Sequence, residues 1–410
     1  MDTLTRRRFL VASGVTGGVL AAGATAYGLR DILDTAGDRD PAAKVLVLVT
    51  LYGGNDGLNT VIPYADPAYR SARPDLAYLP GEVLDLDGGV GLNPGLAGLH
   101  RLFQNRRLAV VRGVGYPKPN RSHFQSMDIW QTAQPDRPGV TGWLGRWLDT
   151  VGGDPRLAVS FEPVLPPLLA GATSAGATVP GGVLSLPGGV SGDLVSGLGR
   201  PSPGESPALA RAAACFADLM RVQDLMRQVT EGASEGDETD DGEEPAATAT
   251  GGAAPPLDQQ LALVARCIEA GAATRVYSVS LGGFDLHADG KAQQRSLLAR
   301  LDEPLTAFAD RMAGKGVVVA VYSEFGRRVR ANASDGTDHG TASDMFLLGD
   351  GVRGGLHGEP PSLTDLDDGD LKFTVDFRDV YATLLDGVLA ADPQRILDGR
   401  RGRVKDLLST

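Results

Sequence analysis

The chain has 410 residues, of which 42% are hydrophobic and 22% are charged, the proportions of an ordinary globular protein. This length suits two or three average domains, or one large α/β domain with insertions. The formal net charge of -12 argues against nonspecific nucleic-acid binding, which needs a basic face, but it allows an anionic substrate because a bound metal ion can invert the local field.

A twin-arginine export signal is predicted at residues 1–30. The sequence TRRRFL at 5–10 stands before an apolar run rich in Gly and Ala at 11–26. This signal implies the twin-arginine translocase as a partner and a location in the periplasm, in the cell envelope or outside the cell. The alternative is an uncleaved membrane anchor, because the apolar run is marginally long enough to span a bilayer.

The first buried strand is predicted at 44–51, where a continuous apolar run is typical of a parallel strand covered on both faces. The sequence YGGNDGLN follows at 52–59 and places Asp56 in a glycine-rich turn. Open α/β sheets bind ligands beyond the carboxyl ends of their strands, so Asp56 is a candidate ligand. The alternative is a plain turn, since Asn-Asp-Gly forms turns without any functional role.

A second parallel strand is predicted at 108–114, followed by a proline-rich loop and a helix that begins near Ser122. A serine at this position acts as an N-cap, and the free amides of the helix also stabilise an oxyanion or phosphate there. Ser122 is therefore either a cap alone or a cap and a nucleophile. Arg121 and His123 flank it and are candidates for the same site, Arg121 as a ligand of a tetrahedral oxyanion.

The middle of the chain is expected to be less regular. Residues 134–205 are rich in Gly, Pro, Leu and Val with little periodicity, which predicts an irregular insertion that shapes a pocket. Residues 231–256 are acidic and of low complexity, which predicts a disordered surface loop. Both segments are assigned to one α/β domain spanning 40–410. Cys215 and Cys267 lie in helical patterns, as two buried thiols or as one bridge between helices.

A third buried strand is predicted at 274–281, after a helix at 257–270. It ends in GGFDLHAD at 282–289, which contains Asp285 and His287. In an extended segment residues i and i+2 point to the same side, so both side chains could face one ion.

A fourth buried strand is predicted at 317–322, rich in β-branched residues. Glu324 follows at its carboxyl end, and Asp338 and His339 come after a polar loop, before a second apolar run at 345–348. These residues are candidate metal ligands, and Arg327 could hold a tetrahedral oxyanion in fork geometry. The alternative is a surface loop with polar residues placed by chance.

Carboxylates and imidazoles without cysteine suit Zn²⁺, Mn²⁺, Fe or Ca²⁺, and do not suit an iron–sulfur cluster. The candidates form two sets, which predicts one or two divalent ions. Two ions would clamp the attacking and leaving oxygens of an in-line displacement. His100 lies in a helical pattern and is expected to be structural.

The motif series resembles an exported bacterial family, the domain of unknown function 1501. The series is GGNDGLNTVIPY, RSHFQSMDIWQTA, GGFDLHADG, VYSEFGRRVRANASDGTDHGTASDMFLLG and GGLHGE, preceded by TRRRFL. The family in turn distantly resembles the alkaline phosphatase and sulfatase superfamily. The resemblance implies an α/β fold with three layers, α/β/α, a mostly parallel central sheet, and a metal site at the carboxyl ends of its strands.

The resemblance also implies roles for individual residues. Ser122 corresponds to the nucleophile, and the implied metal ligands are Asp56, Asp285 with His287, Asp338 with His339, and the late histidine His357; Glu324 competes with Asp338 for the acid role. The implied function is an exported metal-dependent hydrolase of phosphate or sulfate esters, acting on an anionic small molecule or envelope polymer. The alternative is a non-catalytic protein of the same fold that binds a metal or an envelope polymer.

Overall fold

The computed structural model describes residues 25–26, 29–162, 164–179 and 255–409. The export signal up to residue 24, Cys215, and the acidic loop up to residue 254 lie outside the described residues. None of the described helices is long and apolar enough to cross a membrane.

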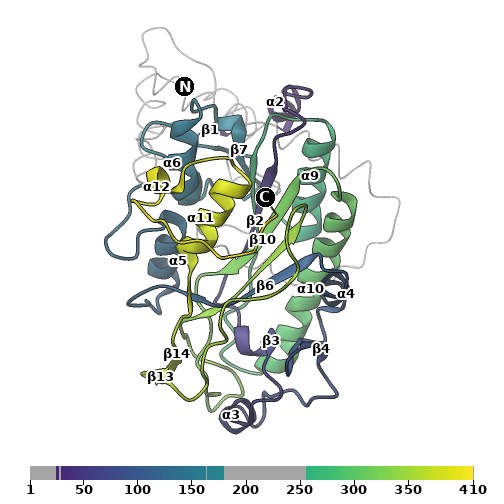
Figure 1. Cartoon of the computed structure of the whole chain (residues 1–410), viewed down its shortest axis with the longest axis vertical. Coiled ribbons are helices and arrows are strands. Elements are labelled where there is room, and N and C mark those ends of the chain that lie inside the picture. Colours follow the sequence, from purple (N-terminus) through teal and green to yellow (C-terminus); the bar gives the residue numbers. More distant parts are fainter. Residues whose placement is uncertain (1–24, 27–28, 163, 180–254, 410) are drawn as a thin grey trace, which may run out of the picture.

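A ten-stranded mixed sheet forms the centre of the molecule (Figure 1). Its order is β1 (Thr25–Ala26), β8 (Ala177–Thr178), β7 (Ala158–Ser160), β9 (Val276–Leu281), β2 (Val45–Leu51), β10 (Val317–Ser323), β11 (Ser343–Gly349), β6 (Leu108–Gly115) and β12 (Gly355–His357), with β15 (Val375–Asp376) also paired to β6. All neighbouring pairs are parallel except those of β11, which is antiparallel to β10 and to β6. The four strands predicted as buried and parallel, β2, β6, β9 and β10, therefore share one direction, which confirms the predicted fold class.

Helices cover both faces of this sheet (Figure 1). One face packs against α4 (Ala97–Gln104), α9 (Leu257–Glu269) and α10 (Gly290–Arg311), and the other against α5 (His123–Thr132), α6 (Trp143–Thr150), α11 (Phe377–Gly387) and α12 (Pro393–Ile396). Along β2, Val45, Val47 and Val49 join the first core, whereas Leu46 and Leu48 join the second. Successive side chains of a strand point to opposite faces, so a strand covered on both faces is apolar at every position.

The segment from 134 to 179 differs from the irregular insertion that was predicted. It contains α6, β7 and β8, and β7 and β8 extend the central sheet beside β9. Trp143 and Trp147 of α6 are fully buried in the second core. The elements here are too short, at two to eight residues, for a periodic pattern to emerge between the glycines and prolines. Residues 180–205 lie outside the described residues.

Smaller elements surround the end of the sheet where β2 leads into η1 (Gly57–Asn59). They are β3 (Val61–Ile62), α3 (Pro67–Ala72), β4 (Leu84–Asp87), β5 (Val90–Leu92), β13 (Leu366–Asp367) and β14 (Asp370–Leu371), and Figure 1 shows α3, β3, β4, β13 and β14 together at the lower end of the view. The remaining elements are α2 (Leu29–Leu33), η2 (Pro155–Leu157) and η3 (Pro167–Leu169). Cys267 of α9 is a buried free thiol.

Candidate metal centre

The loops that follow three adjacent parallel strands meet at one edge of the sheet. Strands β9, β2 and β10 are neighbours in register, with Leu51 of β2 aligned to Leu281 of β9 and to Ser323 of β10. Their carboxyl ends therefore lie side by side, and their loops reach the same point in space. The helix α5 adds His123 from its first turn, because the proline-rich loop after β6 leads directly to it.

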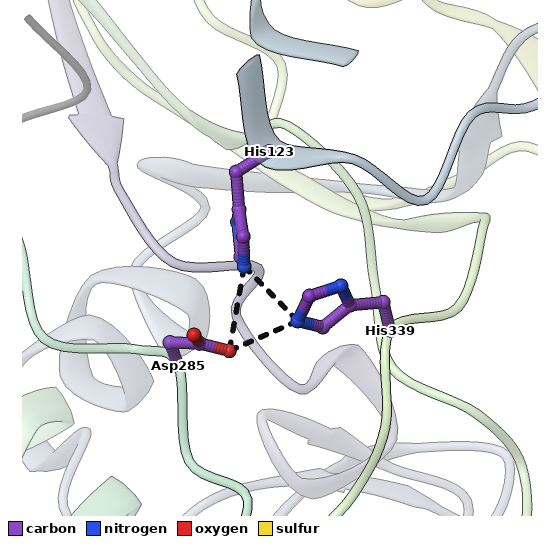
Figure 2. A group of neighbouring side chains, drawn as sticks. All are labelled: His123, Asp285 and His339. Carbon is purple, nitrogen blue, oxygen red and sulfur yellow. Dashed lines mark hydrogen bonds and ion pairs between the residues drawn. The ribbon is translucent and has the colours of Figure 1, made fainter. Parts of the chain in front are cut away.

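Four side chains converge at this edge, and we call them the His/Asp cluster: His123, Asp285, His287 and His339. Nε2 of His123 lies 3.0 Å from Nε2 of His339 and 3.4 Å from Oδ1 of Asp285, and those two atoms lie 3.1 Å apart (Figure 2). Nε2 of His287 lies 2.9 Å from Oδ1 of Asp285 and 3.1 Å from Nε2 of His339. Three imidazole nitrogens thus meet around one carboxylate oxygen.

The opposite nitrogen of each imidazole faces an acceptor. Nδ1 of His123 lies 2.8 Å from Oε1 of Glu324, and Nδ1 of His339 lies 2.8 Å from the carbonyl oxygen of Arg121. Nδ1 of His287 lies 3.5 Å from Oδ1 of Asp338. A carbonyl only accepts, so Nδ1 of His339 carries the proton, and a neutral imidazole then presents the lone pair of Nε2. Two such lone pairs repel each other at 3.0 Å, so the contact between Nε2 of His123 and Nε2 of His339 requires either a proton on one nitrogen or a metal ion between them.

The donor set and its spacing fit a divalent transition metal. Zinc–nitrogen bonds of about 2.0 to 2.1 Å in tetrahedral geometry place ligand atoms roughly 3.3 Å apart, and the three separations among Nε2 of His123, Nε2 of His339 and Oδ1 of Asp285 run from 3.0 to 3.4 Å. Three nitrogen donors suit Zn²⁺, Mn²⁺ or Fe better than Ca²⁺, which takes six to eight oxygens. The side chains of Asp285 and His287 are 47% and 48% exposed, so a substrate can reach the cluster from solvent.

The charges around the His/Asp cluster favour an ionised ligand at Asp285. Burial opposes its ionisation, but the hydrogen bond and charge of Arg327 outweigh this effect and, with His123 and His287, lower the pKa of Asp285 to about 2. The hydrogen bond to Glu324 raises the pKa of His123, whereas burial lowers the pKa of His339. The neutral form of His339 is the one that binds a metal.

Glu324 is a buried support for the His/Asp cluster. Its Oε1 accepts the backbone N–H of Gly53 at 2.9 Å in addition to facing His123, and its Oε2 lies 2.9 Å from Oγ of Ser323. These contacts hold the carboxylate, and a fixed carboxylate fixes the ring of His123. Sequence reasoning named Glu324 as a direct ligand, but the structure places it behind His123. Asp338 likewise contacts His287 from behind and accepts from Nδ2 of Asn332 at 3.1 Å.

Arg327 is buried, and its guanidinium is hydrogen-bonded to five acceptors of the protein. Its guanidinium donates to Oδ1 of Asp285 and to the carbonyl oxygens of Gly53, Gly54, Phe284 and Thr337. It therefore joins the loops after β2, β9 and β10 and orients Asp285. The prediction that Arg327 binds substrate oxygens is corrected accordingly, because its fork is already filled by these acceptors.

Gly53 and Gly54 let the loop after β2 approach its neighbours. Both have positive φ, +113° and +70°. A Cβ at Gly53 would lie 2.5 Å from the backbone nitrogen of Asp285, and a Cβ at Gly54 would lie 2.3 Å from the ring of Phe325. Only glycine combines these backbone angles with these contacts. The signal for both was present in the GGN motif, which was predicted as a glycine-rich turn; the close approach that these glycines allow is to the chain's own backbone and side chains.

Asp56, predicted as a metal ligand, lies outside the His/Asp cluster. Its Oδ2 lies 2.6 Å from Nη1 of Arg73, a fully buried side chain that also donates to Oδ1 of Asn59 and to the carbonyl oxygens of Arg328 and Val329. The carboxylate is thus committed to a buried ion pair. The position of Asp56 in the sequence correctly predicted that it lies at the carboxyl end of β2. It did not show that the chain brings Arg73 back to form an ion pair with this carboxylate.

Arg121 contributes its backbone, and its side chain points to the β13–β14 hairpin. Its guanidinium forms ion pairs with Asp370 and, at 3.2 Å, with Asp368. The predicted role in binding an oxyanion is corrected, because the two acidic partners already neutralise the charge of the Arg121 guanidinium.

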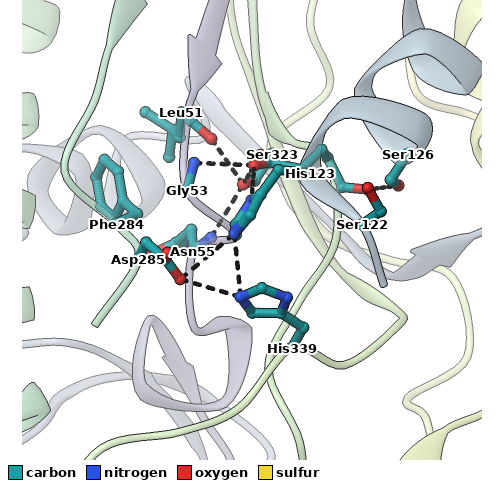
Figure 3. Close-up of polar contacts among 12 residues, drawn as sticks. Leu51, Gly53, Asn55, Ser122, His123, Ser126, Phe284, Asp285, Ser323 and His339 are labelled. Atoms are coloured by element: carbon teal, nitrogen blue, oxygen red, sulfur yellow. Dashed lines mark hydrogen bonds and ion pairs between the residues drawn. The ribbon is translucent and has the colours of Figure 1, made fainter. Parts of the chain in front are cut away.

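Ser122 and His357 also stand apart from the His/Asp cluster. Ser122 precedes α5 as its N-cap residue without a side-chain cap bond, and Figure 3 shows it beyond His123, on the far side from Asp285. His357 belongs to the strand β12 and its Nε2 lies 2.8 Å from the carbonyl oxygen of Arg353. Neither position matches the nucleophile or the late ligand that the family resemblance implied.

Phe325 and Ser126 are parts of the site that sequence reasoning missed. The ring of Phe325 packs against the rings of His123 and His339, with centroids 4.8 Å and 5.1 Å apart. Oγ of Ser126 donates to the carbonyl oxygen of Glu324 at 2.5 Å, which ties α5 to the end of β10. Both residues stood inside the quoted motifs, but a phenylalanine and a second serine carry no chemical signal by themselves.

Comparisons with known proteins give a family and a weak structural likeness. The family model described as "Protein of unknown function (DUF1501)" matches residues 198–409, which include Asp285, His287 and His339. The phosphonate monoester hydrolase SpPMH from Silicibacter pomeroyi is similar in structure with a TM-score of 0.35 and 10% identity, covering 88% of this chain and 77% of that chain. No curated protein matches this chain. At this TM-score and identity the structural likeness supports no transfer of activity or of site residues.

Proposed function

This chain belongs to the DUF1501 family, as its motif series predicted, and from that premise we propose that it is a metal-dependent hydrolase of phosphate or sulfate esters. The observation that carries the proposal is the His/Asp cluster, in which three imidazole nitrogens meet at one carboxylate oxygen of Asp285 with separations of 2.9 to 3.4 Å. Such an arrangement at the open end of an α/β sheet suits a reaction centre rather than a closed structural site.

His123, Asp285 and His339 would hold one divalent ion, and His287 lies beside Asp285 and His339 as a further imidazole. The bound ion would polarise an ester oxygen and make a water molecule more acidic. The described residues contain one group of this kind, so we propose one ion and not two. Counting the formal charges of Asp285, Glu324, Asp338 and Arg327, a divalent ion would bring the net charge of the site to zero, so an anionic ester would no longer meet a net negative site.

The chain's own side chains supply position in this mechanism. Glu324 holds the proton of His123 at Nδ1, and the carbonyl of Arg121 holds that of His339, so both Nε2 atoms stay free. Arg327 keeps Asp285 ionised and fixed. We propose water as the attacking group, because the hydroxyl of Ser122 makes no recorded contact with the His/Asp cluster.

We also propose that the protein acts outside the cytoplasm, after export by the twin-arginine translocase, on an anionic small molecule or envelope polymer and not on nucleic acid. The support is the TRRRFL sequence before an apolar run, with the acidic composition of the chain. Fractionation of cells with and without an active twin-arginine translocase tests this. Equal cytoplasmic retention in both would contradict export.

Metal content of the purified protein is the decisive measurement. We expect about one equivalent of Zn, Mn or Fe by elemental analysis, lost in the double variant His287→Ala, His339→Ala. His357→Ala is the matched control, because it removes an imidazole that lies outside the His/Asp cluster, and it should keep its metal. Absence of metal from the unsubstituted protein, even after reconstitution, would contradict the proposal.

Activity is then measured with p-nitrophenyl phosphate and p-nitrophenyl sulfate. Hydrolysis should disappear on chelation, return when metal is restored, and be absent in the double variant. Metal retained without hydrolysis of any ester would favour the alternative, a metal-binding envelope protein that has no catalytic role.

A further inference from the structure

A pocket of about 650 Å³ opens beside the His/Asp cluster. The loop 115–121 forms one wall of this pocket. Residues 367–373, which include part of the β13–β14 hairpin and the residues that follow it, form the other wall, and Phe325 also lines the pocket. We call it the lateral pocket. Its volume falls within the range of about 300 to 1,000 Å³ that is usual for small-molecule sites.

Two residues connect the lateral pocket to the His/Asp cluster. Phe325 lines the pocket and also packs against the rings of His123 and His339. Arg121 lines the pocket as well, while its carbonyl oxygen accepts the Nδ1 proton of His339 at 2.8 Å. A molecule whose reacting group sits at the His/Asp cluster therefore has the lateral pocket within reach of its remaining atoms.

The walls of the lateral pocket are fixed before any ligand arrives. Arg121 in one wall forms ion pairs with Asp370 and Asp368 in the other, and the Asp370 side chain is almost completely buried. The phenol of Tyr116 is bound at 2.7 Å to Ser126 and accepts the backbone N–H of Asn120 at 3.0 Å, which anchors the loop. A preformed pocket loses little free energy in ordering its own residues on binding.

The surface that the lateral pocket offers is part aromatic and part polar. Phe373 is 37% exposed, one of the few large apolar side chains on the described surface. Lys118 and Asp367 are exposed nearby, and among the described residues neither side chain forms a hydrogen bond or an ion pair. The pocket thus combines a ring face with one free donor and one free acceptor.

We propose that the lateral pocket binds a sugar, so that the substrate is the phosphate or sulfate monoester of a carbohydrate. This inference rests on the proposed function. A sugar ring has an apolar C–H face that suits Phe373 and a rim of hydroxyls that both donate to Asp367 and accept from Lys118. A purely apolar group would desolvate Lys118 and Asp367 without pairing them.

Calorimetric binding to the metal-loaded protein tests the sugar site without requiring turnover. The probes are glucose 6-phosphate, glucose 6-sulfate, phenyl phosphate and methyl phosphate. We expect the glucose esters to bind more tightly than phenyl or methyl phosphate, and Phe373→Ala to weaken their binding by about tenfold. Lys118→Ala should weaken the same probes. Phe124→Ala is the matched control, because it removes a ring that is 74% exposed and does not line the pocket.

The outcomes separate this inference from the proposed function. Binding of glucose esters that depends on Phe373, without hydrolysis, would support the sugar site and contradict the hydrolase. Hydrolysis of methyl phosphate with no preference for glucose esters, unchanged in Phe373→Ala, would support the hydrolase and overturn the sugar site. Tighter binding of phenyl phosphate than of either glucose ester, or no binding of the glucose esters, would also overturn it.

Discussion

Oε1 of Glu324 lies 2.8 Å from Nδ1 of His123, although 201 residues separate them in the chain. The carboxylate stands at the end of β10, is almost completely buried, and also accepts the backbone N–H of Gly53. It therefore fixes which nitrogen of His123 carries the proton and where the ring points. A carboxylate behind a metal-binding histidine has this effect on metal affinity in many proteins.

Glu324→Gln should lower metal affinity by about 10- to 100-fold, because the neutral amide no longer accepts the Nδ1 proton of His123 with a full charge. Competition with a chelator of known affinity measures the loss. Glu82→Gln, which replaces an exposed carboxylate distant from the His/Asp cluster in the sequence, is the control and should leave metal affinity unchanged. Equal affinity in Glu324→Gln and the unsubstituted protein would show that Glu324 does not support the site.

The strands that precede the loops of the His/Asp cluster could be predicted from the sequence, because a strand that is buried on both faces has a recognisable run of apolar residues. Each residue of β2, β9 and β10 is buried, and the three runs are mostly apolar, although β9 includes Ser278 and Ser280. The carboxyl end of each run is the edge of the sheet where ligands bind. Asp285, His287 and His339 were predicted as ligands in this way, and the structure brings their side chains together. The antiparallel direction of β11 could not be predicted, because a buried parallel strand and a buried antiparallel strand have the same apolar sequence pattern.

The roles of charged residues could not be predicted because their partners come from elsewhere in the fold. Arg327 follows Glu324 closely in sequence and resembles a substrate-binding arginine, yet it ends among carbonyl oxygens of loops more than 40 residues away. Whether a charge at a strand end meets a ligand or another part of the chain depends on contacts that no local pattern encodes. Asp56 illustrates the same point.

Asp56→Ala should destabilise the protein without removing its metal. It leaves the buried guanidinium of Arg73 without its carboxylate, which costs about 3 to 5 kcal/mol when a buried pair is broken on one side. The double variant Asp56→Ala, Arg73→Met should recover part of this loss, since no unpaired charge remains. Urea unfolding and elemental analysis measure both effects. Loss of metal in Asp56→Ala with unchanged stability would instead make Asp56 a ligand.

Ser122→Ala and Ser126→Ala form a matched pair within the first turns of α5. Ser122 is exposed and its hydroxyl caps nothing, so its loss should leave stability, metal content and ester hydrolysis unchanged. Ser126 is buried and its hydroxyl donates to the carbonyl of Glu324, so its loss should cost about 1 to 3 kcal/mol of unfolding free energy. If Ser122→Ala abolishes hydrolysis while metal is retained, the hydroxyl is the nucleophile after all.

Glu162 predicts a pH dependence of stability that is separate from the metal site. It is fully buried, lies 3.0 Å from the hydroxyl of Tyr52 and 3.3 Å from that of Ser278, and burial raises its pKa from an ordinary 4.5 to about 7. The folded protein therefore holds this proton more tightly than the unfolded chain does. The resulting stabilisation is complete below pH 4.5 and is lost as pH rises through about 7.

Between pH 5.5 and pH 8, this one group should lower the free energy of unfolding by ~2 kcal/mol. Glu162→Gln keeps a neutral side chain at every pH, so it should remove that part of the decline and be more stable than the unsubstituted protein at pH 8. Urea unfolding of both proteins at the two pH values measures the difference. Glu303→Gln, on the exposed side of α10, controls for the loss of one negative charge and should retain the full decline. Identical pH dependence in Glu162→Gln and Glu303→Gln would mean that Glu162 is ionised in the folded protein.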